Sequence, residues 1–389
     1  MSLNLDPNRS GVLPSQMIAE AIKSGWVHSE VGEIPDENIQ PSSLDLRLGD
    51  VAYRLRCSFL PDNKSVEEKL ERYQMGEIDL GGDGGILEQN RPYLVPLVER
   101  LELPAHVRAK ANPKSSTGRL DIFTRVITDR SFMFDEIPSG YRGRLYLEIV
   151  PRTFTIKVRP GLTLNQLRLM VGQSGLTDRD VEELHQQTPL LFNGGTPLDT
   201  NEIAVSNGLF LGLNLGLGRD RVGFRAKENS QLIDLSKVDH YYPDPFWEVV
   251  RSEPGGRIVL HPEKFYLLLS KDSVRIPPQY AAEMTAYDPT SGELRTHYAG
   301  FFDPGFGWGK EPDGIIGSRA ALEVRAHDVP FAVEHGQNIC KLSFERMLDV
   351  PDRLYGHDLA SNYQGQEIAL SKHFKRKRRT RSMQSDLFE

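Results

Sequence analysis

The feature that most constrains the fold of this chain is an internal repeat, in which the same short patterns occur twice in the same order. Residues 91–97 (Arg-Pro-Tyr-Leu-Val-Pro-Leu) have a counterpart at residues 264–270, and residues 145–149 have one at residues 320–324. The second copy follows the first at nearly the same spacing in each pair. A regular spacing of this length indicates that the chain consists of two copies of one structural unit, one after the other.

The local pattern within each copy is that of short β-strands. Residues 146–150 and 156–158 mix apolar and polar positions in short runs, separated by Pro, Gly and Asp. Two helices stand out, one over residues 14–25 and one that begins after Thr177, a suitable N-cap. Short, regularly spaced strands with few helices predict a mainly β chain in which each copy closes into a barrel or sandwich.

The boundary between the copies is expected near residue 195, at the Asn-Gly-Gly turn of residues 193–195. This predicts an N-terminal domain of residues 1–195, a C-terminal domain of residues 196–370 and a basic tail of residues 371–389. Because blocks of like charge are usually disordered, the tail is expected to be a solvated, flexible end rather than a phosphate-binding arm.

The composition excludes several classes of protein. The 389 residues carry a formal charge of −7, which gives no reason to expect general nucleic-acid binding. No apolar run is long enough to span a bilayer, and residues 1–12 lack the pattern of a signal peptide. Two cysteines, Cys57 and Cys340, lie far apart in the sequence, so we expect a reduced, cytoplasmic protein without membrane contact.

Two polar strings are candidates for substrate contacts. Residues 39–49 (Ile-Gln-Pro-Ser-Ser-Leu-Asp-Leu-Arg-Leu-Gly) form a turn that enters an alternating strand. Residues 114–119 (Lys-Ser-Ser-Thr-Gly-Arg) combine a cation, hydroxyls and a backbone turn with an arginine, which suits a polyphosphate. Taken alone, the second string is more typical of a polar hairpin turn.

A third string carries a glutamate within an apolar strand. Residues 296–307 (Thr-His-Tyr-Ala-Gly-Phe-Phe-Asp-Pro-Gly-Phe-Gly) precede Glu323, which follows Ala321 and Leu322. A buried carboxylate is costly without partners, and such groups are often functional. An outward-facing glutamate on a half-exposed strand is the alternative, and periodicity alone leaves both open.

Together these strings resemble the dCTP deaminase family, whose members share the trimeric dUTPase barrel. The family's opening motif corresponds to residues 40–48, its phosphate motif (Arg-Ser-Ser-x-x-Arg) to residues 114–119 and its base-binding hairpin to residues 296–306. Its catalytic Leu-Glu strand corresponds to residues 147–148 in copy one and residues 322–323 in copy two. Together with the lid motif nearer the C-terminal end, these make five matches in order, which are more specific than any single one.

The lid motif of the family corresponds to Tyr355 and, further on, to residues 362–366, so the resemblance implies that Tyr355, Asn362 and Gln366 contact the substrate. Asn362 stands where the family usually has a lysine. The positive charge missing there could be replaced by Lys372 or another residue of the tail.

The resemblance, which extends from residue 11 to about residue 366, implies an architecture. It is closest to the long, duplicated form of the family, and implies two tandem dUTPase-like β-barrels of the distorted jelly-roll type with a few short helices. Three barrels close one trimer in the family, whereas this chain carries two. A homo-oligomer is therefore expected, with the number of chains left open.

The losses in the two copies are complementary. Copy one keeps the phosphate motif, but residues 129–137 replace the compact hairpin. Copy two keeps the hairpin, but its phosphate segment carries Asp288 and Glu293, which would repel a triphosphate. Because the family's site lies between barrels, we predict one composite site. Its substrate-binding residues are Lys114, Ser115, Ser116 and Arg119 from copy one with Ala299 and Asp303 from copy two.

The resemblance implies hydrolytic deamination of dCTP to dUTP and ammonia, a step that supplies dUTP in pyrimidine deoxynucleotide metabolism. Glu323 is the expected general base and acid, and Glu148 is the alternative because its strand matches equally well. Ser115 would hold the attacking water with the backbone near Ala299, while Arg119 would orient the glutamate. Asp303 would contact the deoxyribose 3′-hydroxyl.

No tightly bound cofactor or metal site is expected. Zinc-dependent cytidine deaminases combine His-x-Glu with Pro-Cys-x-x-Cys. The chain contains His28-Ser29-Glu30 but lacks any Cys-x-x-Cys, so we expect no zinc. Magnesium is expected to accompany the triphosphate rather than to sit in a protein cage.

Two other functions remain open at this point. A dUTP pyrophosphatase, or a bifunctional enzyme that releases dUMP from dCTP, would need an aspartate that aims water at the α-phosphate, for which copy one offers Asp129 or Asp135. A non-catalytic deoxynucleotide-binding protein on the same fold is the second alternative. Inhibition by dTTP, which the family often shows, is a further possibility.

Overall fold

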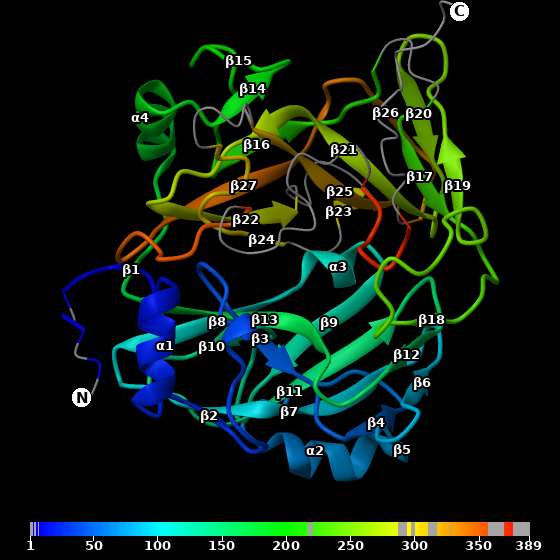
Figure 1. Ribbon diagram of the computed structural model, residues 1–389. Helices are drawn as coiled ribbons and strands as arrows, with labels where there is room; N and C mark the ends of the chain where they lie inside the picture. Colours follow the sequence, from blue (N-terminus) through cyan, green and yellow to red (C-terminus); the bar gives the residue numbers. More distant parts are fainter. Residues whose placement is uncertain are drawn as a thin grey trace, which may run out of the picture.

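The structure is a computed structural model that describes residues 3, 5–6, 8–216, 221–286, 294–296, 300–309, 317–326, 328–356 and 369–375, with only the backbone of residues 286 and 294–296. The predicted residues Ala299, Asn362 and Gln366 therefore lie outside the described residues, as do Asp288 and Glu293 and most of the basic tail. The described part is mainly β, as the short alternating runs predict, and its strands form two barrels stacked one above the other (Figure 1).

The first barrel is built from residues 11–171. Its strands are β1 (Gly11–Val12), β2 (Val27–Ser29), β3 (Leu44–Arg47), β4 (Val51–Leu55), β5 (Gln74–Asp79), β6 (Gly85–Leu87), β7 (Tyr93–Glu102), β8 (Val107–Pro113), β9 (Ile122–Ile127), β10 (Glu136–Ile137), β11 (Arg142–Pro151), β12 (Ile156–Val158) and β13 (Thr163–Val171). Its helices are α1 (Ser15–Lys23), the short 3-10 helix η1 (Asp36–Asn38), α2 (Val66–Tyr73) and α3 (Ser115–Gly118).

The second copy, which forms the second barrel, follows helix α4 (Asp178–Gln187). Its strands are β14 (Leu191–Asn193), β15 (Thr196–Pro197), β16 (Leu209–Gly212), β17 (Gly223–Ala226), β18 (Ile233–Asp234), β19 (Trp247–Val250), β20 (Arg257–Leu260), β21 (Phe265–Val274), β22 (Tyr280–Ala286), β23 (Leu294–Thr296), β24 (Phe301–Phe302), β25 (Ser318–Ala326), β26 (Phe331–Glu334) and β27 (Asn338–Arg346).

The internal repeat appears as matching strand pairs. In the first barrel β7 pairs with β11, and Leu94 lies opposite Glu148. In the second, β21 pairs with β25, and Leu267 lies opposite Glu323. The pairs β8–β13 and β22–β27 correspond in the same way. The two glutamates therefore occupy equivalent positions on equivalent strands.

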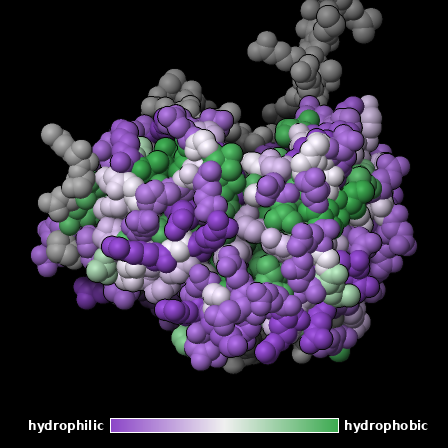
Figure 2. Space-filling view, turned by 90° about the horizontal axis from the view of Figure 1, so that it is seen from below, coloured by the Kyte–Doolittle hydropathy of each residue, from purple (hydrophilic) through white to green (hydrophobic). Residues whose placement is uncertain are grey.

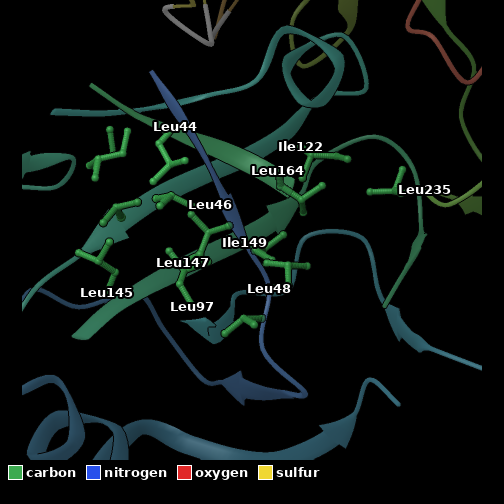
Figure 3. Packing of buried hydrophobic residues seen from close by; sticks show 14 of the residues in the cluster. Leu44, Leu46, Leu48, Leu97, Ile122, Leu145, Leu147, Ile149, Leu164 and Leu235 are labelled. Carbon is green, nitrogen blue, oxygen red and sulfur yellow. The ribbon is translucent and has the colours of Figure 1, made fainter. Parts of the chain in front are cut away.

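The period-2 pattern of β11 explains where its side chains point. Leu145, Leu147 and Ile149 point into the barrel and pack against Leu46 and Leu97 (Figure 3). The residues between them, Tyr146 and Glu148, therefore face outward. The same alternation in β25 directs Leu322 and Val324 inward and Glu323 outward.

The two predicted helices of the sequence are present. The first is α1, which is somewhat shorter than expected. The second is α4, which begins after Thr177 with a capping box: the Thr177 hydroxyl accepts from the Asp180 N–H, and the Asp180 carboxylate accepts from the Thr177 N–H. Helix α2 was not anticipated.

The two barrels are interlocked rather than joined by a simple linker. Strand β18 of the second copy pairs in parallel with β12 of the first. Phe246, Trp247 and, near the chain end, Phe374 pack into the core cluster of the first barrel. Val181 and Leu184 of α4 pack instead into the second cluster. The domain division near residue 195 stays a prediction, while this packing places α4 with the second core.

Two further observations concern the chain as a whole. Cys57 is exposed and Cys340 is buried, and both are free thiols. Among the described residues, none of the helices is both long and apolar enough to cross a membrane.

Candidate active site

A cavity of about 280 Å³ lies between the two barrels and collects side chains from both copies. From the first copy it is lined by Glu37, Gln40, Asp45, Pro113, Lys114, Ser115, Ser116, Arg119 and Gln166. From the second copy it is lined by Met284, Gly300, Phe301, Phe302, Asp303, Phe306, Ala321, Glu323, Tyr355 and Lys372. The structure thus brings together the described members of the composite site that the sequence predicts.

The string of residues 114–119 forms one wall as the short helix α3, which follows directly after β8. The Lys114 N–H and the Thr117 hydroxyl both donate to the Leu164 carbonyl of β13, at 3.0 and 2.9 Å. The Lys114 ammonium pairs with the Asp45 carboxylate and donates to the Thr163 hydroxyl at 3.1 Å. These bonds hold α3 against the barrel, so Ser115 and Ser116 are presented to the cavity on a fixed turn.

Glu323 is a buried carboxyl of the cavity. Burial raises its pKa well above the usual value, with the positive charge of Arg119 opposing the rise and Asp121 adding to it. Its carboxyl lies against Gly118 of α3: a Cβ at that position would be 2.5 Å from Oε2 and 2.9 Å from Cδ. The close approach of the two barrels at this point therefore depends on the missing side chain of Gly118.

Asp303 is tied to the first barrel by the opening motif. The Ser42 hydroxyl donates to its Oδ1 at 2.5 Å, and Ser42 in turn accepts from the Arg168 guanidinium at 3.0 Å. Arg168 is fully buried, pairs with Glu345 at 2.6 Å and stacks on the Phe301 ring, 3.9 Å from its centroid. Burial raises the pKa of Asp303, while the Ser42 hydrogen bond and the Arg168 charge oppose that rise. This chain of contacts fixes the hairpin of copy two against copy one.

Glu148 lies outside the cavity, although its strand matches that of Glu323. It is fully buried, pairs with Arg125 at 2.6 Å and accepts a hydrogen bond from Ser58 at 2.6 Å. The outward face of β11 is covered by the chain's own α2 segment. The apolar contacts there form a separate cluster of Leu55, Phe59, Val66, Leu70, Leu94, Ile127 and Tyr146.

Because α2 covers the outer face of β11, the surface of the molecule on that side is mainly hydrophilic. In Figure 1, α2 lies at the bottom of the first barrel, and Figure 2 views the molecule from there. Hydrophilic side chains predominate in that view, and apolar ones gather in separate patches. In the second barrel the equivalent face meets the first barrel, since the Glu323 carboxyl of β25 lies against Gly118 of α3. One glutamate is therefore covered by its own copy on the outer face of the barrel, and the other faces a cavity between barrels.

The hairpin of copy one also differs from that of copy two at a decisive position. β10 pairs with β8 as β24 pairs with β22, and Gly140 and Gly305, both with positive φ, make the equivalent turns. By this correspondence Pro138 of copy one stands where copy two has Asp303. The altered hairpin that the sequence indicates thus lacks the carboxylate as well.

Comparisons with known proteins identify the family. The model of the 2′-deoxycytidine 5′-triphosphate deaminase (DCD) N-terminal domain matches residues 9–173, and that of the C-terminal domain matches residues 177–374. The chain belongs to the dCTP deaminase family. The crystal structure of 2′-deoxycytidine 5′-triphosphate deaminase from Agrobacterium tumefaciens is similar over 87% of this chain and 99% of that chain, with 45% identity and a TM-score of 0.81.

Shorter dCTP deaminases match about half of the chain. One from Natronomonas pharaonis is 30% identical over 197 residues, which are 49% of this chain and 90% of the relative. A "dCTP deaminase, dUMP-forming" from Methanosphaera stadtmanae is 25% identical over 195 residues, 49% of this chain and 89% of the relative. These coverages agree with a duplicated family member.

Within this dCTP deaminase chain, three residues in or beside the cavity were not anticipated as site residues from the sequence. Gln166, Ser42 and Gly118 approach the site through strand pairing or close packing. Gln166 accepts a hydrogen bond from Ser43 at 3.1 Å. The only sequence signal for Ser42 and Gly118 was that they lie within the motifs of residues 39–49 and 114–119. No sequence pattern indicated Gln166. Tyr355, the described lid residue, lies with its ring 5.7 Å from that of Phe306.

The structure contains no group of three or more His, Cys, Asp or Glu side chains that could hold a metal ion, among the residues it describes. Magnesium bound together with the triphosphate stays a prediction. Lys114, Ser115 and Ser116 are the residues that would contact such a complex, through charge and hydroxyl groups.

Proposed function

We propose that this chain catalyses the hydrolytic deamination of dCTP to dUTP and ammonia at the cavity between its two barrels, with Glu323 as the proton-transferring residue. The observation that carries the proposal is the placement of Glu323. A carboxyl that is buried between barrels with a raised pKa, beside a guanidinium and facing a phosphate-type motif, is suited to proton transfer.

In the proposed reaction, water adds to C4 of the cytosine ring while Glu323 takes one of its protons and delivers it to N3. A second proton then passes from the added hydroxyl to the exocyclic amine. The C4–N bond breaks, ammonia leaves, and the C4 oxygen becomes the carbonyl of uracil. The exchange consumes one water and needs no other reactant.

The water would be held at the junction of the two copies. Ser115 and Gly300 are adjacent across the cavity, since a Cβ on Gly300 would lie 3.8 Å from the Ser115 hydroxyl. The backbone of the neighbouring Ala299 is the proposed second water ligand. Arg119, whose Nη1 donates to the Ala369 carbonyl at 3.1 Å, would keep the glutamate oriented and stabilise the developing charge.

The pH profile of the reaction should reflect the buried carboxyl. Because Glu323 must be ionised to accept a proton from water, kcat/KM for dCTP should fall about tenfold per pH unit below its pKa. That pKa is raised well above the usual carboxyl value, so the acid limb should lie at a higher pH than for an exposed glutamate. Initial rates measured across the pH range, with circular dichroism to confirm folding, would test this. An acid limb at the ordinary carboxyl pKa would contradict the assignment.

The rival activities make different products. Neither aspartate named for a dUTP pyrophosphatase lines the cavity: Asp129 accepts from the Val66 N–H at 2.7 Å at the start of α2. Asp135 lies in a separate cavity beside β8 and β9. We therefore favour dUTP over dUMP as the product.

Chromatography of the nucleotides and an ammonia assay, with dCTP and magnesium and with or without 1,10-phenanthroline, would test the proposed function. Ammonia with dUTP, insensitive to the chelator, is expected. Pyrophosphate with dUMP would support the bifunctional, dUMP-forming activity after which some relatives are named. Binding of dCTP without turnover would indicate a nucleotide-binding protein instead. Light scattering would test the proposed homo-oligomer. The same activity assay with added dTTP would test the proposed inhibition by dTTP.

A further inference from the structure

The end of the described chain, residues 369–375, returns from the second copy and packs onto the first barrel; we call it the C-terminal clasp. Ala369, Leu370 and Phe374 are buried in the first core cluster. The Phe374 ring lies 5.4 Å from Phe246 and 5.9 Å from Trp247. In Figure 1 the red end of the ribbon lies between the barrels, close to α3. The clasp is therefore anchored, in contrast to the flexible tail expected from this sequence.

The clasp is bonded directly to the phosphate-motif helix. The Ser371 hydroxyl donates to the Ser116 carbonyl at 2.9 Å, and Arg119 donates to the Ala369 carbonyl at 3.1 Å. On its other side, the Lys372 carbonyl accepts from the Asp239 N–H at 2.9 Å. Contacts on both sides of Lys372 hold its backbone in one place, and its side chain lines the cavity.

The charge of the cavity makes Lys372 important. Its described lining residues include four carboxyl groups but only three bases, Lys114, Arg119 and Lys372. Arg119 lies beside Glu323, and the Lys114 ammonium is paired with Asp45. The carboxyl groups of the cavity oppose a polyanionic substrate, so each of the three bases that line it, Lys372 included, adds to the binding of such a substrate.

We propose that Lys372 binds the phosphate chain of the substrate beyond its first phosphate, so that the C-terminal clasp makes the enzyme select a nucleoside triphosphate over the monophosphate. This inference rests on the proposed function, since it concerns the substrate of the same cavity.

The electrostatics of the two lysines support this role. Burial lowers the pKa of Lys372, the nearby positive charge of Lys114 lowers it further, and Asp45 opposes both effects. Two ammonium groups held near each other repel, and a phosphate oxygen between them turns that repulsion into attraction. The site is thus built for an anion by residues from opposite ends of the duplicated chain.

The test compares Lys372→Met with the matched variant Lys375→Met. Lys375 belongs to the same segment, but it is exposed, stacks over the Tyr242 ring at 4.0 Å and does not line the cavity. In Lys372→Met, KM for dCTP should rise roughly 10- to 100-fold, as for the loss of one charged hydrogen bond, while kcat changes little. KM for dCMP should be nearly unchanged. Lys375→Met should resemble the unmodified protein, and Lys372→Arg should restore part of the loss.

Binding measurements keep this inference separate from the proposed function. Dissociation constants of dCTP and dCMP for Glu323→Gln protein, with and without Lys372→Met, need no turnover. A loss of affinity confined to dCTP supports the role of Lys372 even if the unmodified protein fails to deaminate dCTP, which would overturn only the proposed function. Equal losses for dCTP and dCMP, or no loss for either, would overturn the role of Lys372.

Discussion

Replacing Glu323 by glutamine is expected to lower kcat for dCTP by about 10²- to 10⁴-fold, the usual contribution of a general acid–base residue. The physical reason is that the amide cannot take the proton from water, although it has the same shape. Steady-state kinetics, with dUTP followed by chromatography, would measure the loss. The matched variant is Glu148→Gln, which changes the equivalent position of the other copy and should keep kcat within a few-fold of the unmodified protein.

The two glutamine variants should also differ in stability: Glu148→Gln should lower it, and Glu323→Gln should raise it. Glu148 is fully buried and paired with Arg125, so its neutralisation leaves a partly buried cation without its partner charge. A decrease of about 1–3 kcal/mol in the free energy of unfolding is expected, because Arg125 retains some contact with water. Loss of activity in Glu148→Gln with full activity in Glu323→Gln would reverse our assignment of the copies.

For Glu323→Gln, the direction of the change in stability follows from the raised pKa of Glu323. A carboxyl whose pKa is higher in the folded than in the unfolded state favours folding at low pH, and this contribution is lost as the pH rises through the folded pKa. Glutamine does not titrate. Glu323→Gln protein should therefore unfold at a higher temperature than the unmodified protein above that pKa, which thermal denaturation at several pH values would show.

Substituting valine for Gly118 is expected to reduce deamination by about 10²-fold or more while the fold persists. The three atoms nearest to a Cβ at this position all belong to the Glu323 carboxyl, at 2.5 to 2.9 Å. Because that carboxyl ends a flexible side chain, it can move aside at small cost to stability. A displacement of about 1 Å is enough to cost about 10²-fold in rate.

The control for this substitution is Gly76→Val in β5, where an added Cβ has nothing within 4 Å. Valine is favoured in strands, so both activity and thermal stability should stay near those of the unmodified protein. If Gly118→Val retained full activity, the contact between α3 and Glu323 would have no catalytic importance. If it failed to fold, as judged by circular dichroism, the assumption that the carboxyl moves aside would be wrong.

Much of the architecture could be read from local patterns. The alternation of β11 and β25 and the N-cap at Thr177 depend on a few neighbouring residues, and the repeat is visible as short motifs that occur twice. The complementary losses in the two copies, a phosphate motif in one and a compact hairpin in the other, were also visible. They predicted one site between barrels, and the cavity between the barrels contains the described residues of that prediction.

The distinction between Glu148 and Glu323 was beyond local patterns. Both strands read alike, and what separates the two residues is the element that covers each outward face. For Glu148 that element is α2 with Ser58 and Arg125. α2 is a short, highly charged helix whose sequence says nothing about which face it covers.

By itself, therefore, the sequence determined the two mainly β copies, the family and the composite nature of the site, because strand alternation and motif chemistry depend on neighbouring residues. Only the tertiary structure decided which glutamate faces the cavity, why Gly118 must be small and that Lys372 joins Lys114. Arg119 and Ala369 are separated by 250 residues along the chain yet share a hydrogen bond. Contacts at such separations arise from the packing of whole barrels, which no short pattern encodes.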